Sequence, residues 1–147
     1  MYNVFDVAKY AINYGTKRGT PISNLQLQKI LYYIQLNFYR KLDKPAFMDD
    51  FIAWPYGPVV ERVYHQFSIY GSSDICKIYP EVEGLFVGND RIVVDFVIHA
   101  CIQISAWELV EKSHRKDGPW DKVYKGGIGS GEIISKDNII SYAKTGC

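Results

Sequence analysis

Apolar residues recur at helical spacing along the chain, most clearly over residues 24–41. In this segment they fall on two nearly opposite sides of the predicted helix. One side holds Leu27, Ile30, Leu31, Ile34, Phe38 and Leu42, and the other holds Leu25, Tyr32, Leu36 and Tyr39. A helix that is apolar on two sides packs against neighbours on both, so the pattern predicts the central helix of the domain. Ser23 with Gln26 three residues on is a capping box at its start.

Shorter segments with helical spacing lie on either side of this helix. They predict a mainly α fold, with about five to six helices around the central one and minor short β-strands, as a single domain over residues 1–147 with a core at about 4–143. Strands are predicted near residues 75–78 and 85–87. The other predicted helices are residues 4–15 with Asn3 as N-cap, 59–70, 105–112 opened by Ser105 and Glu108, a turn at 121–124 capped by Asp121, and a last helix to about Lys144 capped by Ser135 or Asp137.

Residues 91–104 fit two structures equally well. Alternate positions are apolar and β-branched residues are dense, as in a strand. Val94, Val97, Ile98, Cys101 and Ile102 also fit one face of a helix, and fourteen residues is an ordinary helix length. The residue pattern alone leaves helix and strand open.

Residues 53–59, Ala-Trp-Pro-Tyr-Gly-Pro-Val, form the most constrained stretch of the chain. Pro55 and Pro58 fix their own φ angles and bias the preceding residues away from helix. Gly57 can adopt backbone angles that other residues avoid. We therefore expect a rigid corner that holds Trp54 and Tyr56 in place, with Pro58 near the first turn of the next helix.

Charge and cysteine content indicate which partners and which cellular compartment to expect. Lys and Arg number 17 against 16 Asp and Glu, so no basic stripe is implied and nucleic-acid binding is not expected. The odd set Cys76, Cys101 and Cys147 has no framework spacing, which indicates a reducing compartment. The N-terminal segment lacks a long apolar run, so neither a signal peptide nor a membrane span is predicted. We expect a cytoplasmic protein with an oligomeric state that the sequence leaves open.

The histidines and cysteines do not form a recognisable catalytic or metal-binding set. His99 and Cys101 are two residues apart and have no second pair, so no metal site is predicted. No flanking pattern supports a nucleophile among the cysteines. The glycine-rich residues 126–131 lack the Lys-Ser/Thr ending of a phosphate loop. We therefore predict no catalytic residues, no metal and no cofactor, and the alternative of an enzyme would use His114.

Aromatic residues are abundant, with twelve tyrosines in the chain. Tyrosine offers a large rigid apolar area with a polar tip and is enriched at interfaces. Its excess here fits either a partner surface or a core rim whose hydroxyl groups reach water.

Three segments, in order and at matching spacing, resemble the motifs of one family. Residues 27–33, Leu-Gln-Lys-Ile-Leu-Tyr-Tyr, are similar to the K-L-Q-K-L-L-Y-Y element of the Panacea antitoxin domain, found in SocA-like and phage-associated GepA-like proteins. Residues 53–59 resemble its A-W-x-x-G-P-V element. Ser113-His114 followed by Pro119-Trp120 resembles its T-H-x-x-x-P-W element, with Ser113 in place of Thr.

The resemblance implies a mostly helical domain in which residues 91–104 are helical. It implies an antitoxin whose partner is a cognate protein toxin, neutralised by direct binding. In some members the second partner is a bacterial protease, to which the antitoxin delivers the toxin as an adaptor.

The motif positions are the candidate scaffold or partner-binding residues. Trp54, Tyr56 and Trp120 either contact the toxin or pack the corner against the central helix. Gln28 and Lys29 are expected to hydrogen-bond the backbone of the corner, and His114 to cap or tie a loop. The full set is Gln28, Lys29, Tyr32, Tyr33, Trp54, Tyr56, Gly57, Pro58, Ser113, His114 and Trp120.

Overall fold

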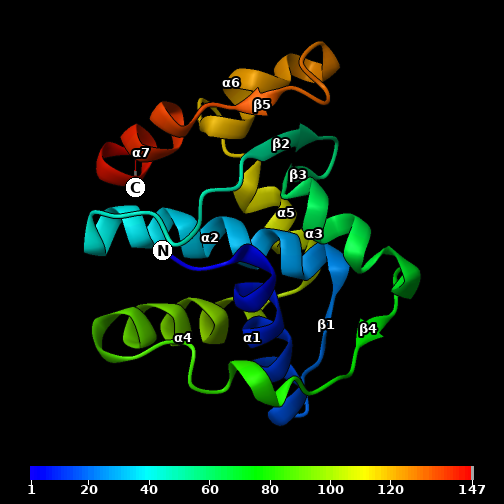
Figure 1. The fold of residues 1–147 in the computed structure, drawn as a ribbon. Helices are drawn as coiled ribbons and strands as arrows, with labels where there is room; N and C mark the ends of the chain where they lie inside the picture. Colours follow the sequence, from blue (N-terminus) through cyan, green and yellow to red (C-terminus); the bar gives the residue numbers. More distant parts are fainter. Residues whose placement is uncertain (147) are drawn as a thin grey trace.

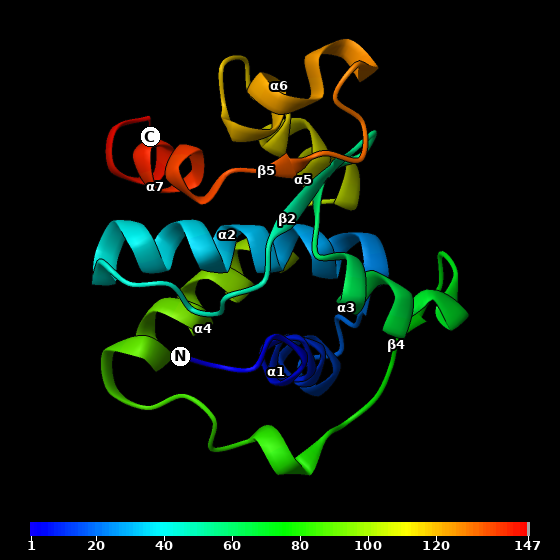
Figure 2. The ribbon, with the colours of Figure 1, turned by 45° about the horizontal axis from the view of Figure 1, so that its top comes forward.

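The structure, a computed structural model, describes residues 1–146 and is built around one long helix. Helix α2 (Asn24–Leu42) crosses the middle of the molecule (Figure 1). Helices α1 (Val4–Lys17) and α4 (Gly88–Ile102) lie on one side of it, and α6 (Pro119–Tyr124) and α7 (Lys136–Thr145) lie on the other (Figure 2). The predicted mainly α fold with a central helix and short strands is confirmed, with seven α-helices in the described part of the chain.

Both apolar sides of α2 are buried, as its sequence pattern predicts. Leu27 and Ile30 on one side are completely inaccessible to solvent, and Tyr32 and Leu36 on the other side are buried. Between the two stripes, Gln28, Lys29 and Gln35 are buried as well, whereas Arg40 near the end of the helix is exposed. Up to its last turn the helix is therefore enclosed on nearly all sides, and its buried polar side chains must find partners within the protein.

Helix starts follow the predicted caps. The Asn3 side chain accepts from the Phe5 N–H, and Ser23 and Gln26 form the complete capping box. Ser105 opens α5 (Ala106–Ser113), and Ser135 opens α7 by accepting from the Asn138 N–H. Each cap satisfies a backbone donor that the first helical turn leaves free.

The corner at residues 53–59 forms a β-hairpin. Strands β2 (Phe51–Trp54) and β3 (Gly57–Val59) pair antiparallel, with Ala53 opposite Pro58. Strand β5 (Ile133–Ile134) pairs with the other edge of β2, giving the order β3-β2-β5. A second small sheet joins β1 (Ile22–Ser23) to β4 (Asp74–Ile75).

Two predicted helix starts are wrong. Pro58 lies in β3 and not in a first helical turn; the helix predicted over 59–70 is α3 (Glu61–Gln66) followed by a 3₁₀ turn, η1 (Ser68–Tyr70). As an edge strand, β3 tolerates a residue without an N–H. Helix α6 begins at Pro119 rather than 121, and Asp121 accepts from the Asp117 N–H instead of capping.

Residues 85–87, predicted as a strand, lead without strand pairing into α4. Residues 91–104 are helical to Ile102, as the resemblance implies, and Val94, Val97, Ile98 and Cys101 are buried at helical spacing. Two short 3₁₀ turns complete the described elements, η2 (Pro80–Val82) and η3 (Lys125–Gly127).

Within the described residues Cys76 is exposed, Cys101 is buried, and both are free thiols; Cys147 lies outside this range. No helix of residues 1–146 is by itself both long and apolar enough to cross a membrane. Helices α4 and α5 have the length and composition of a membrane span only when they are taken together, and the chain bends by 115° between them.

Candidate functional site

The three motif segments meet at Gly57, at the tip of the β2–β3 hairpin. Gly57 has a φ of +109°, a conformation that favours glycine. A Cβ atom built on it would lie 2.6 Å from Ser113 Oγ and 2.8 Å from Lys29 Cε. The absence of a side chain at Gly57 thus lets the hairpin, α2 and the end of α5 come into contact.

Lys29 places an amine inside this junction. Its Nζ donates to the Pro58 carbonyl oxygen over 2.7 Å, as expected of a residue that binds the corner backbone. The side chain is completely buried, and burial lowers the pKa of Lys29 to about 7. Within residues 1–146 no carboxylate pairs with it. The amine therefore acts as a hydrogen-bond donor to β3 rather than as half of an ion pair.

Gln28 ties α2 to the chain just after the corner. Its Oε1 accepts from the Val60 N–H over 2.9 Å, and its Nε2 donates to Asn24 Oδ1. Asn24 in turn donates to the Tyr64 carbonyl oxygen over 3.0 Å. This chain of bonds fixes the passage from β3 into α3.

The third motif closes the junction from the opposite side. Trp120 Nε1 donates to the Trp54 carbonyl oxygen over 2.8 Å, and the indole stacks on the His114 ring at 3.7 Å. Ser113 Oγ donates to the Val110 carbonyl oxygen. His114 Nε2 is buried and has no hydrogen-bond partner in the part of the chain that the structure describes. Burial together with the nearby charge of Lys29 lowers the pKa of His114, against the opposing effect of Asp121.

Comparison with known proteins matches the sequence of this chain to one family. Residues 27–121, which contain all three motif segments, match the family model described as antitoxin SocA-like, Panacea domain. The chain belongs to the SocA-like Panacea antitoxin family. It is 33% identical over 132 residues to Antitoxin SocA of Caulobacter vibrioides (strain NA1000 / CB15N), covering 82% of this chain and 69% of that protein. No solved structure matches.

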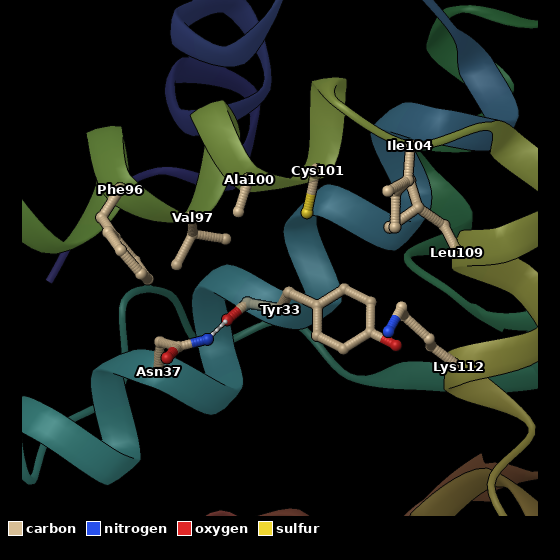
Figure 3. A pocket seen from close by; sticks show the side chains of 9 residues that line it. All are labelled: Tyr33, Asn37, Phe96, Val97, Ala100, Cys101, Ile104, Leu109 and Lys112. Carbon is tan, nitrogen blue, oxygen red and sulfur yellow. Dashed lines mark hydrogen bonds between the residues drawn. The ribbon is translucent and has the colours of Figure 1, made fainter.

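The motif tyrosines of this Panacea domain lie in two different environments. Tyr32 is buried, with its ring edge against Phe51 of β2 at 5.5 Å between centroids. Tyr33 lines a groove between α2, α4 and α5 (Figure 3). Its hydroxyl group is buried and has no hydrogen-bond partner among residues 1–146.

Solvent reaches the junction at three aromatic rings. Tyr56, at the hairpin tip, is 56% exposed and meets Trp107 of α5, which is 59% exposed, edge to face at 5.5 Å. Trp54 is partly exposed and packs against Tyr64 at 4.8 Å. Trp107 was not among the predicted site residues. Its sequence position could have indicated this role, because Trp107 lies on the polar side of the short helix, opposite Leu109.

The junction is suited to holding backbone in place. Lys29, Ser113 and His114 supply an amine, a hydroxyl and an imidazole, but Lys29 and Ser113 are buried and bond to carbonyl oxygens. In residues 1–146 no three His, Cys, Asp or Glu side chains are grouped to hold a metal ion. The arrangement presents a rigid hairpin tip to solvent.

Proposed function

We propose that this protein is an antitoxin that neutralises a cognate protein toxin by binding it directly. Its family supports the antitoxin role. The observation that carries direct binding is the exposed pair of Tyr56 and Trp107 above a buried polar junction.

This aromatic pair has the properties of a binding anchor. Large aromatic side chains supply much of the energy of protein interfaces, and a few such residues dominate. Rings that are already held in place lose little conformational entropy on association. Tyr56 is held by a hairpin whose tip is fixed through Gly57 and Pro58, and Trp107 supports it from α5.

The buried motif residues have a different role in this proposal. Lys29, Gln28 and Trp120 bond to backbone groups and hold the hairpin against α2 and α6. They act as scaffold, and the exposed residues around them meet the toxin.

Co-expression tests the proposal. The protein is produced together with the product of the adjacent open reading frame, in a host with its cytoplasmic proteases and in one without them. We expect growth to be restored in both hosts, with the toxin still present, because blocking requires no degradation. Loss of rescue in the protease-deficient host would instead indicate a proteolytic adaptor, and growth arrest with every neighbouring gene would contradict an antitoxin role.

The contact surface is tested in the same assay. The double substitution Tyr56→Ala with Trp107→Ala should abolish rescue at low expression. Ile69→Ala removes a large apolar side chain that is even more exposed but lies in η1, and should rescue like the unmodified protein. Full rescue by the double variant would overturn the role of the pair.

A further inference from the structure

A groove of about 310 Å³ opens between α2, α4 and α5 (Figure 3). Its walls are mostly apolar, with Val97, Ala100 and Cys101 on α4 and Leu109 on α5. The volume is at the small end of the range of about 300–1,000 Å³ typical of ligand pockets. It therefore suits one or two apolar side chains better than a cofactor.

Tyr33 gives this apolar groove an unsatisfied donor. Its ring crosses the groove between the residues of α4 and Lys112, and its backbone carbonyl oxygen accepts from Asn37 Nδ2 over 2.8 Å (Figure 3). Its hydroxyl group has no partner in the described chain. A buried polar group without a partner is costly, and an occupant that brings an acceptor oxygen would remove this cost.

The charged side chains that line the groove and the hollow beside it are all basic. Lys112 is part of its wall, and the Lys41 amine lies 5.0 Å from the ring centre of Phe96, which also lines it. A neighbouring hollow shares Tyr33 and Lys112 with the groove and is also lined by Arg40 and Arg115. Neither hollow has an aspartate or glutamate in its lining. Electrostatic complementarity favours an occupant that carries carboxylates.

We propose that this groove binds an acidic segment of the toxin, which inserts a large apolar side chain between α4 and α5 and places an acceptor oxygen on the Tyr33 hydroxyl group. The inference rests on the proposed function and adds a second contact surface. Helix α5 links the two surfaces, since Trp107 meets Tyr56 and Leu109 lines the groove.

Filling the groove tests this inference. Ala100 is exposed and lines the groove, so Ala100→Phe adds a ring there without opening the core. We expect at least a tenfold loss of affinity for the toxin identified by co-expression, measured by calorimetry with the purified proteins. His99→Phe places the same ring at the preceding position of α4, which is also exposed but outside the groove lining, and should bind within twofold of the unmodified protein.

Two further variants keep the test independent of any folding defect. Tyr33→Phe removes the unsatisfied hydroxyl group, so we expect about fivefold weaker toxin binding with no fall in melting temperature. Lys112→Glu should weaken binding about tenfold and flatten its dependence on salt, whereas Lys116→Glu, an exposed charge reversal outside the groove lining, should not.

Normal toxin binding by Ala100→Phe, Tyr33→Phe and Lys112→Glu would overturn the groove inference. If the Tyr56 and Trp107 double variant still lost binding, the proposed function would stand. Absence of toxin binding by the unmodified protein would overturn both. If Ala100→Phe abolished self-association in sedimentation velocity and left toxin affinity unchanged, the occupant would be a second copy of this chain, and the inference would be wrong.

Discussion

At the scale of single residues, Lys29 has the least usual environment in the site. Its amine is enclosed by the protein and donates to the Pro58 carbonyl oxygen of an edge strand. Burial of a charged amine is unfavourable, so the Lys29 amine binds a proton less tightly inside the junction than it would in water.

This environment predicts a specific pH dependence of stability. The pKa of Lys29 is about 7 in the folded protein, below the ordinary lysine value of about 10.4, so between these values the unfolded chain binds more protons. The Lys29 contribution to the free energy of unfolding should therefore rise by about 1.4 kcal/mol per pH unit above pH 7 and level off near pH 10.

This rise is measured by chemical denaturation of the unmodified protein and of Lys29→Met at pH 7, 8 and 9. The difference between their free energies of unfolding should change with pH. Lys116→Met, which removes an exposed amine, serves as the control and should follow the unmodified protein. A difference between Lys29→Met and the unmodified protein that does not change with pH would contradict a buried amine with a lowered pKa.

Part of this chemistry could be predicted from sequence. That Lys29 binds the corner backbone follows from its polar position between two apolar stripes, and the 2.7 Å bond to Pro58 confirms it. Its complete burial could not be predicted, because it depends on α5 and the hairpin closing over α2 from distant parts of the chain. The exposed Trp107 was not predicted as a site residue because it lies outside all three motif segments, and its contact with Tyr56 depends on how the hairpin folds against α5.

At the scale of elements, features formed by residues close in sequence could be predicted, whereas pairings between distant segments could not. The starts of α1, α2, α5 and α7 follow from caps whose hydrogen bonds span two or three residues. The hairpin depends on β5, which pairs with β2 from near the other end of the chain. Pro58 fits both a first helical turn and an edge strand, and nothing within its own segment decides between them.

A substitution at Gly57 tests how closely the hairpin packs against α2. Gly57→Ala should lower the free energy of unfolding by about 2–4 kcal/mol, because the new Cβ combines a strained φ with close contacts to Lys29 and Ser113. Gly19→Ala is the matched control: its φ is +72° but nothing lies within 4 Å of the added atom, so it should cost only about 1 kcal/mol. Equal losses in urea denaturation would show that crowding at the junction is unimportant.

At the scale of the whole molecule, the buried polar junction and the exposed surfaces have different roles. The motifs that mark the Panacea family lie mostly inside, where they hold the hairpin, α2, α5 and α6 in one arrangement. In the proposed function, the toxin meets Tyr56, Trp107 and the groove around that arrangement. In this proposal most of the family motif defines the scaffold, whereas Tyr33 and Tyr56 of the motif segments, together with Trp107 outside them, contact the toxin.

Calorimetric titration of the purified protein with the toxin that it rescues in co-expression tests direct binding most directly. We predict a stoichiometric complex with the unmodified protein, and an affinity reduced by at least about 30-fold for the Tyr56→Ala, Trp107→Ala double variant, as expected when two interface anchors are removed. The account would be contradicted if no complex formed although growth is rescued, or if the double variant bound as tightly as the unmodified protein.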